Sequence, residues 1–559
     1  MIEVSGTANE RMCGRSNRVA GGFIVLIVLI TLAAIEAPRF VAPFRAARSA
    51  LPAPQIMPSV ELWLSTADHK LKLAPQPDIA MSAQGSASAD VTIDPKARYQ
   101  TITGFGAAMT DSSAWLLHTK LNDRQRDDVL RELYGPPPNL NFNMTRLTIG
   151  SSDFSLNVYT LDDIPFGKTD PQLKHFNIAS NLQDVIPVMR EVLAVNPGML
   201  TIASPWGAPA WMRTTQNLLG GELLEQFEST YADYLVKYLD AYRSHGIPIF
   251  ALTLQNEPAY APISYPGMTM GAKTRARLVS EYLGPKLAAR KPRTGILEWD
   301  HNWTPVEEPL NVLADPDAAR YIDGVAWHCY GGSQHEQGRV HRAHPDKDAY
   351  ITECTGGDWP LYINGELLWF TRNLLVTGIR QWARGVVYWN LALDENHGPH
   401  FGGCSACKGV ITIDSETGAV TRNDEYYALA HFSRFVEPGA FRVNSTDTDV
   451  GDKGVANVAF QNETDGSIVL VMVNLNKDER RVSVADGRNR FGYTMPAESV
   501  GTFVWHPDLA GLWIRRAQRW LSGASVPPHV EELIQPAIEL SRWAVWALPS
   551  TYFSKGIGA

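Results

Sequence analysis

The segment Ile249-Phe250-Ala251-Leu252-Thr253-Leu254-Gln255-Asn256-Glu257 is an apolar run that ends in an amide and a carboxylic acid. A second run, Ala349-Tyr350-Ile351-Thr352-Glu353, also ends in a carboxylic acid. Short continuous apolar runs of this kind predict buried strands. A buried carboxylate is costly unless it is paired or used. The acids at these two strand ends therefore indicate either structural ion pairs or a catalytic role.

Apolar strand candidates recur eight times along the chain, and helical patterns follow most of them. The candidates are Thr101–Met109, Met144–Gly150, Leu200–Trp206, Ile249–Glu257, Thr294–Trp299, Ile322–Tyr330, Ala349–Cys354 and Gly385–Leu393. Alternation of strand and helix predicts a parallel sheet. Eight repeats over about 300 residues favour a closed barrel over an open sheet. We therefore predict an α/β fold with a (β/α)8 TIM barrel over residues 101–435.

Short strands with alternating polarity lie on both sides of this barrel. Residues 436–505 contain several of them, separated by turns such as Asp465-Gly466, and predict a β-sandwich domain. Residues 59–100 contain two more strand patterns, which we expect to join the same domain. Residues 38–58 are rich in Pro and Ala and are typical of a linker.

The N-terminus has the pattern of an export signal. Arg11, Arg15 and Arg18 precede an apolar run from Val19 to Ile35, and small residues follow it. This predicts a signal peptide within residues 1–37. The run is also about as long as a short membrane span, so an uncleaved N-terminal anchor is the alternative. Either way, we expect a secreted or extracytoplasmic protein.

The C-terminal extension, residues 506–559, has a helical pattern that carries Trp513 and Trp520 with Arg515 and Arg516 between them. Three interpretations stay open. The extension is a helical pair packed on the protein, an appendage without a fold of its own, or an amphipathic helix that contacts a membrane surface.

Composition excludes several classes. Apolar residues make up 45% and charged residues 19%, which is typical of a globular protein. The net charge of −9 disfavours nucleic acid, whose phosphates require a basic face. The spacing of the five cysteines does not suggest a zinc site, and we expect neither a metal nor a cofactor. For Cys404 and Cys407, a disulfide and two free thiols both stay open.

In a TIM barrel the chemistry gathers at the carboxyl ends of the strands. Glu257 and Glu353 would then face one another, and two carboxyls across one sugar bond hydrolyse glycosides. At a separation of about 5–5.5 Å one of them attacks carbon directly and configuration is retained. Asn256 is placed to bind the sugar 2-hydroxyl, and we expect His328 and Tyr330 to orient the nucleophile as an anion.

The chain also resembles glycoside hydrolase family 30, in its glucosylceramidase-like branch, between about Val91 and Trp505. The similar stretches are Thr103–Asp111, Arg146–Tyr159, Ala203-Ser204-Pro205-Trp206, Asn256-Glu257-Pro258 and Trp389–Asp394. The resemblance implies a retaining mechanism without metal, with Glu257 as acid/base and Glu353 as nucleophile. It also implies roles for six residues around the sugar. Four of them hold glucose: Asp153, Trp206, Asn256 and Trp389. Phe154 and Tyr330 line the cleft.

Two departures concern the aglycone side. Lysosomal members carry His-Trp-Tyr where this chain has His328-Cys329-Tyr330, and the loop from Asp394 to Lys408 is more similar to bacterial members. The first expectation is a glucosylceramidase-type β-glucosidase acting on a β-glucoside, glycolipid or glucan, with a role in carbohydrate or sphingolipid metabolism. The alternatives are an endo-β-1,6-glucanase or β-xylosidase, a non-catalytic carbohydrate-binding protein, and an exported metal-dependent hydrolase.

Overall fold

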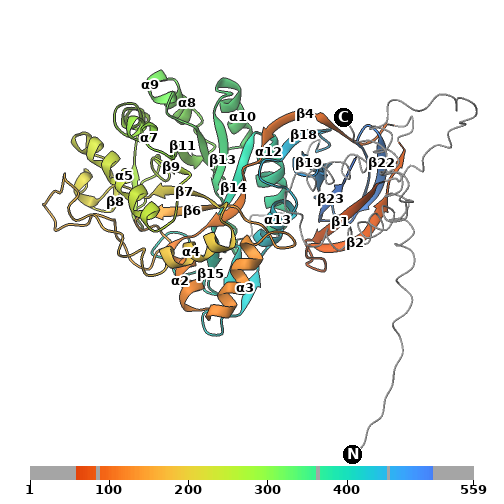
Figure 1. Cartoon of the computed structure of the whole chain (residues 1–559), viewed down its shortest axis with the longest axis horizontal. Coiled ribbons are helices and arrows are strands. Elements are labelled where there is room, and N and C mark those ends of the chain that lie inside the picture. The colour runs from red at the N-terminus through yellow and green to blue at the C-terminus, as the bar shows by residue number, and fades with distance from the viewer. Residues whose placement is uncertain (1–57, 84–87, 360–364, 450–453, 508–559) are drawn as a thin grey trace, which may run out of the picture. The chain divides into compact units, whose positions relative to one another are not determined.

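The computed structural model of the chain describes residues 58–83, 88–359, 365–449 and 454–507 (Figure 1). The predicted signal or anchor segment, nearly all of the linker and nearly all of the C-terminal extension lie outside the described residues. Among the helices that the structure describes, none is long and apolar enough to cross a membrane.

Eight parallel strands close into a barrel, which confirms the predicted fold class. Their order is that of the chain, and the last strand pairs with the first through Gly385 and Gly104. The strands are β5 (Gly104–Ala108), β6 (Met144–Ile149), β7 (Leu200–Pro205), β9 (Ala251–Thr253), β11 (Gly295–Asn302), β12 (Gly324–His328), β13 (Asp348–Glu353) and β14 (Ala383–Asn390).

The fourth barrel strand is shorter than the sequence predicts. β9 ends at Thr253, whereas the apolar run continues to Glu257. The backbone leaves the ladder because Asn256 N–H donates to the carbonyl of Pro205 and Glu257 N–H donates to that of Asp300. Glu257 therefore lies on a loop held by the two neighbouring strands.

One apolar layer fills the lower barrel. Seven of the eight strands contribute one buried side chain each to it: Met144, Ile202, Ala251, Leu297, Ala326, Tyr350 and Val387. The remaining strand, β5, approaches β6 so closely that a Cβ on Gly106 would lie 1.8 Å from the carbonyl oxygen of Met144. Only glycine fits there.

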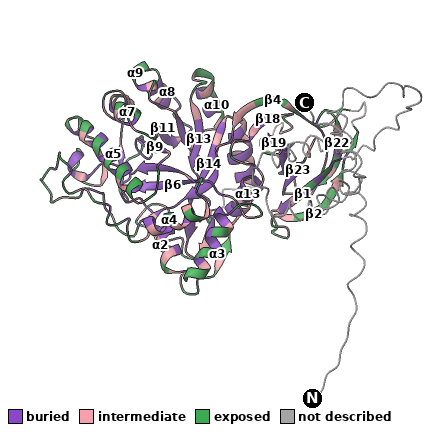
Figure 2. Ribbon diagram, in the orientation of Figure 1, coloured by how far each residue is buried: buried purple, intermediate pink, exposed green. Residues whose placement is uncertain are grey.

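Helices cover the outside of the barrel, with buried faces toward the strands and exposed faces outward (Figure 2). Local capping starts several of them, as where Asn122 and Gln125 form a capping box on α3. The helices are α2 (Asp111–Thr119), α3 (Asp123–Tyr134), α4 (Val185–Val195), α5 (Glu228–Ser244), α6 (Ala272–Arg277), α7 (Gly284–Ala288), α8 (Glu307–Leu313), α9 (Pro316–Ala319), α10 (Gln334–Ala343), α11 (Gly365–Trp369), α12 (Gly378–Arg380) and α13 (Asp424–Ser433).

Short elements complete the barrel loops. Two π-helical turns, η3 (Leu278–Leu283) and η4 (Phe370–Thr377), continue α6 and α11, and two 3-10 turns are η1 (Ala210–Met212) and η2 (Glu225–Phe227). The small loop strands are β8 (Leu219–Glu222), β10 (Gly267–Thr269), β15 (Ala392–Leu393), β16 (Ile411–Ile413) and β17 (Val420–Arg422).

A ten-stranded β-region is built from both ends of the described chain. Its order is β2-β1-β23-β20-β19-β18-β4-β21-β22-β3, so strands that precede the barrel lie among strands that follow it. The strands are β1 (Ser59–Thr66), β2 (Ala74–Ala80), β3 (Ser82–Ala83), β4 (Val91–Thr101), β18 (Phe441–Ser445), β19 (Val455–Gln461), β20 (Ile468–Asn474), β21 (Arg480–Ala485), β22 (Asn489–Met495) and β23 (Ser499–Trp505).

Two polar side chains, one half-buried and one fully buried, connect the barrel helices to this β-region. Arg380 donates to the carbonyl of Asn457 at 2.6 Å and to the hydroxyl of Ser445 at 2.9 Å. On α13, His431 bridges the hydroxyls of Thr502 at 2.7 Å and Ser65 at 2.8 Å. Burial lowers the pKa of His431 to about 3, so the imidazole is neutral in the folded protein.

We predict that His431 makes the stability of the fold sensitive to acid. The unfolded imidazole titrates near pH 6.5, above the folded pKa, so its contribution is complete above that pH and is lost as the pH falls toward 3. The expected slope is up to about 1.4 kcal/mol per pH unit. Urea unfolding between pH 4 and 8 should show that His431→Gln removes this slope. Parallel curves for the two proteins would contradict the assignment.

Candidate active site

The predicted catalytic carboxylates meet at the carboxyl end of the barrel. Glu353 ends β13, and Glu257 lies on the loop that follows β9. His328 lies between them, with its Nδ1 3.1 Å from Glu257 Oε1 and 3.8 Å from Glu353 Oε1. These two oxygens are therefore within about 7 Å of one another, a bound that includes the separation of about 5–5.5 Å found in retaining enzymes.

Arg146 is the buried cation of this site. Its side chain has no exposed surface, and its guanidinium donates to Glu353 Oε2 at 2.6 Å, Asp300 Oδ2 at 2.8 Å and Asn256 Oδ1 at 2.7 Å. The bond to Arg146 fixes the amide of Asn256, whose NH2 group has no partner among the described residues. That group is free to donate to a sugar hydroxyl, as the sequence predicts for Asn256.

Asp300 is the central acceptor beneath the two acids. Its two oxygens lie 2.7 to 3.1 Å from donors on five different barrel strands. The cation and these hydrogen bonds outweigh burial and hold the pKa of Asp300 well below its usual range. The donors are Arg146, Ser204, Thr253, His328 and Thr352.

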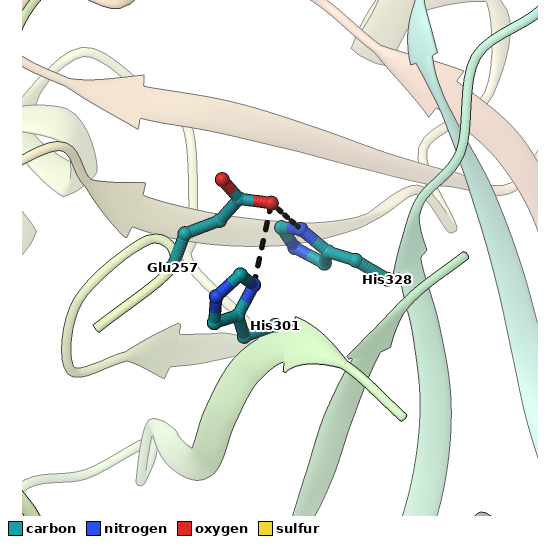
Figure 3. A group of neighbouring side chains, drawn as sticks. All are labelled: Glu257, His301 and His328. Atoms are coloured by element: carbon teal, nitrogen blue, oxygen red, sulfur yellow. Dashed lines mark hydrogen bonds and ion pairs between the residues drawn. The ribbon is translucent and has the colours of Figure 1, made fainter. Parts of the chain in front are cut away.

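Glu257 is held by two imidazoles (Figure 3). His328 Nδ1 is 3.1 Å and His301 Nδ1 is 3.4 Å from Glu257 Oε1. Burial alone would raise the pKa of Glu257, but the two neighbouring histidines prevail and lower the pKa to about 2. Burial would lower the pKa of His328, but Glu353, Asp300 and Glu257 raise it to about 9. The proton of this pair therefore lies on His328, one hydrogen bond from Glu257.

His328 and Tyr330, which were both expected to orient Glu353, make different contacts. Tyr330 donates its hydroxyl to Glu353 Oε1 at 3.0 Å, as expected for a residue that orients the nucleophile. His328 is closer to Glu257 than to Glu353, because the bond from its Nε2 to Asp300 sets the ring. His328 therefore mainly contacts Glu257, the predicted acid/base.

Trp206 and Trp389 form the aromatic wall of the site. Their rings are stacked, with centroids 5.0 Å apart, and the Arg146 guanidinium lies over both. Phe154 differs from its expected place in the cleft lining. It is fully buried and meets Trp389 edge-on at 6.2 Å, so it supports the wall and offers no face to a sugar.

Asp153 lies at the inner end of the site. Burial, and then the nearby charge of Glu353, hold its pKa well above the usual range. The loop after the eighth strand covers it: Phe401 N–H donates to the Asp153 carbonyl, and a Cβ on Gly403 would lie 2.5 Å from the Asp153 Cβ. A protonated Asp153 can donate to a sugar hydroxyl.

Two disulfides flank the site. Cys404 and Cys407 are bonded in the loop after the eighth strand, and they pack with the aromatic wall. Cys329 and Cys354, whose Cα atoms are 5.3 Å apart, are bonded directly after His328 and Glu353. This second bond joins the strand end that carries Tyr330 to the one that carries the predicted nucleophile.

Sequence reasoning missed several residues of the site. It did not single out Arg146, although a charged residue inside the apolar run Met144–Ile149 is a signal of a buried partner. It also left out Asp300, His301 and Tyr265. Tyr265 packs beside the aromatic wall, but its loop has no periodic pattern from which this could be read.

Backbone strain marks the same region. Glu257 has a φ of 49°, and Trp299 and Asp300 have φ values of 75° and 56°. Such left-handed conformations are costly for residues other than glycine and gather at functional sites. A cavity of about 360 Å³ at the opposite end of the barrel is a poorer candidate, because its arginines are paired with Asp323 and Asp348.

Two family descriptions match the chain in succession. The Glycosyl hydrolase family 30 TIM-barrel domain matches residues 102–436, and the Glycosyl hydrolase family 30 beta sandwich domain matches residues 439–503. The chain belongs to glycoside hydrolase family 30. It is therefore a glycoside hydrolase, as the sequence predicts.

The relatives of this family 30 enzyme are named for two different activities, that of a glucanase and that of a glucosylceramidase. An endo-1,6-beta-D-glucanase of Neurospora crassa is 35% identical over 76% of this chain and 90% of its own length. The lysosomal acid glucosylceramidase of Mus musculus is 29% identical over 74% of this chain and 83% of its own. A solved endo-beta1,6-glucanase structure superposes with a TM-score of 0.72 at 31% identity, covering 80% of this chain and 99% of that one.

We predict that the Cys329–Cys354 bond positions the nucleophile. Replacing both cysteines by alanine should lower kcat roughly 10- to 100-fold, because misplacement by about 1 Å has this effect. The matched control, Cys404→Ala with Cys407→Ala, should act on KM, since that pair packs on the sugar wall. Steady-state kinetics on an aryl β-glucoside separate the two. An unchanged kcat beside a lowered melting temperature would mean that the bond only stabilises.

Proposed function

We propose that this family 30 enzyme is a retaining endo-β-1,6-glucanase, with Glu353 as nucleophile and Glu257 as acid/base. The observation that carries the chemistry is the arrangement of two carboxylates around His328, in which only one is held by a guanidinium. Arg146 and Tyr330 both donate hydrogen bonds to Glu353. Glu257 instead faces the histidine that stores a proton.

The proposed reaction has two steps. Glu353 attacks the anomeric carbon while Glu257 protonates the departing oxygen, so the glycosidic bond breaks and a glycosyl-enzyme forms. Glu257, now a base, then takes a proton from the water that releases the sugar. The Asn256 NH2 group and Asp153 are the proposed donors to the sugar hydroxyls, and Trp206 and Trp389 bind its apolar face.

The apolar side chains around the mouth of the barrel favour a substrate in which the leaving group is itself a sugar. The exposed large apolar residues of the described chain all lie in segments that follow barrel strands: Leu156, Phe166, Leu182, Tyr260, Ile263, Tyr330 and Phe401. Four of them are aromatic, and they lie on the loops after the second, fourth, sixth and eighth strands. Aromatic faces with a wet edge suit the rings of a polymer. The 35% identity to a protein named for β-1,6-glucan supports this choice.

Glucosylceramide hydrolysis is the second candidate. The mouse lysosomal acid glucosylceramidase aligns over most of both chains, and an apolar rim also suits a lipid. A β-xylosidase activity has weaker support, because solved xylanases share only 20 to 23% identity with this chain. The two disulfides among the described residues support the further proposal that the enzyme acts outside the cytoplasm.

Paired variants should separate the two acids. Glu353→Gln removes the covalent route and should lower kcat by roughly four orders of magnitude, with azide restoring turnover to a product of inverted configuration. Glu257→Ala should affect glucans far more than activated aryl glucosides, because only the former need a proton on the leaving oxygen. Equal losses on both substrate types, or no azide rescue, would contradict the roles.

A substrate panel should separate the candidate functions. We expect kcat/KM on a linear β-1,6-glucan to exceed that on glucosylceramide in detergent by at least tenfold, which is about 1.4 kcal/mol of transition-state binding. Product sizes distinguish endo action from release of single glucose units. The reverse preference would support the glucosylceramidase, and turnover of aryl xylosides alone would support the xylosidase.

A further inference from the structure

Three atoms that can ligate a metal lie close together beside the proposed acid/base: Glu257 Oε1, His301 Nδ1 and His328 Nδ1 (Figure 3). The oxygen lies 3.4 Å from the His301 nitrogen and 3.1 Å from the His328 nitrogen. Zinc binds nitrogen and carboxylate oxygen at about 2.0–2.2 Å in tetrahedral sites, so ligand atoms on one zinc ion are about 3.3 Å apart. The two oxygen–nitrogen separations already match the edges of such a tetrahedron.

The two histidines can each present Nδ1 to a metal. His328 Nε2 lies 3.1 Å from Asp300 Oδ1, so the proton on that nitrogen is held by a carboxylate. A metal would displace the other proton, which lies between Nδ1 and Glu257. A carboxylate, a histidine and a metal in line is the usual outer support of zinc sites. His301 is nearly buried, and its Nδ1 makes no hydrogen bond among the described residues.

The charge around this cluster favours a cation. Glu257, Asp300 and Glu353 are three carboxylates, and Arg146 is the buried guanidinium that contacts two of them, Asp300 and Glu353. The other nearby cation is the protonated His328, whose extra proton a metal would replace. A divalent ion would offset the remaining negative charge, and its open fourth position would face the cleft.

We propose that Glu257, His301 and His328 form an inhibitory zinc site. A bound ion coordinates the carboxylate that must carry the catalytic proton, and its binding releases the proton that the cluster shares. Glu257 can then neither protonate a leaving group nor accept a proton from water. The ligand set of two nitrogens and one oxygen selects Zn²⁺ or Cu²⁺ over Ca²⁺ and Mg²⁺, which prefer oxygen alone.

The test measures binding and inhibition separately. Calorimetry with Zn²⁺ on the whole protein should show one site, and Co²⁺ in its place should give the visible absorption of a four-coordinate ion. Zn²⁺ should inhibit hydrolysis of an aryl β-glucoside, excess EDTA should restore it, and Ca²⁺ and Mg²⁺ should have no effect. This test does not depend on which glycoside is the natural substrate.

Two variants and one control assign the site. His301→Gln should weaken Zn²⁺ binding at least 10- to 100-fold, the range found when even an outer partner of a metal ligand is lost. Glu257→Gln should do the same in calorimetry, whatever its activity. His175→Gln, at an exposed histidine, should bind Zn²⁺ as the wild type does. Wild-type binding by both site variants, or an equal loss in the control, would overturn the proposal.

Discussion

The site depends on one buried guanidinium. Arg146 faces Asp300 and Glu353, and without it these carboxylates would share a pocket that has almost no access to water. Removing one partner from a buried ionic group costs about 3–5 kcal/mol, because an uncompensated charge stays behind. Arg146 also separates the two acids chemically: it donates to Glu353 and leaves Glu257 to the histidines. The proposed division into nucleophile and acid follows from which carboxylate the cation reaches.

Asp300 links this charge balance to the positions of the barrel strands. Because its donors come from five strands, small movements of any strand would break bonds to a fully buried anion. The left-handed backbone at Trp299 and Asp300 is the strain that this network sustains. His328, held by Asp300, then sets where the proton of Glu257 is stored. The catalytic end of the barrel is thus more constrained than the apolar layer below it.

The sequence predicts the barrel and both acids because each depends on a local pattern, an apolar run that ends in a carboxylate. Arg146 and Asp300 were missed, since their meaning lies in partners on other strands. The Cys329–Cys354 bond could have been predicted from the order of the strands. β12 and β13 are neighbours, and His328 pairs with Glu353 in register, so the cysteines that follow them must be adjacent. The packing of Tyr265 depends on loop conformation, which no periodicity encodes.

The same bond bears on substrate choice. Lysosomal members of the family carry a tryptophan where this chain has Cys329, a smaller residue whose bond to Cys354 joins the two strand ends covalently. Tyr330 keeps its hydroxyl on Glu353 but is 44% exposed. In the proposed endo-glucanase, the smaller residue would leave room for a sugar on the leaving side, and the covalent bond would keep the proposed nucleophile in place. That combination suits cleavage within a chain better than closure around a single terminal glucose.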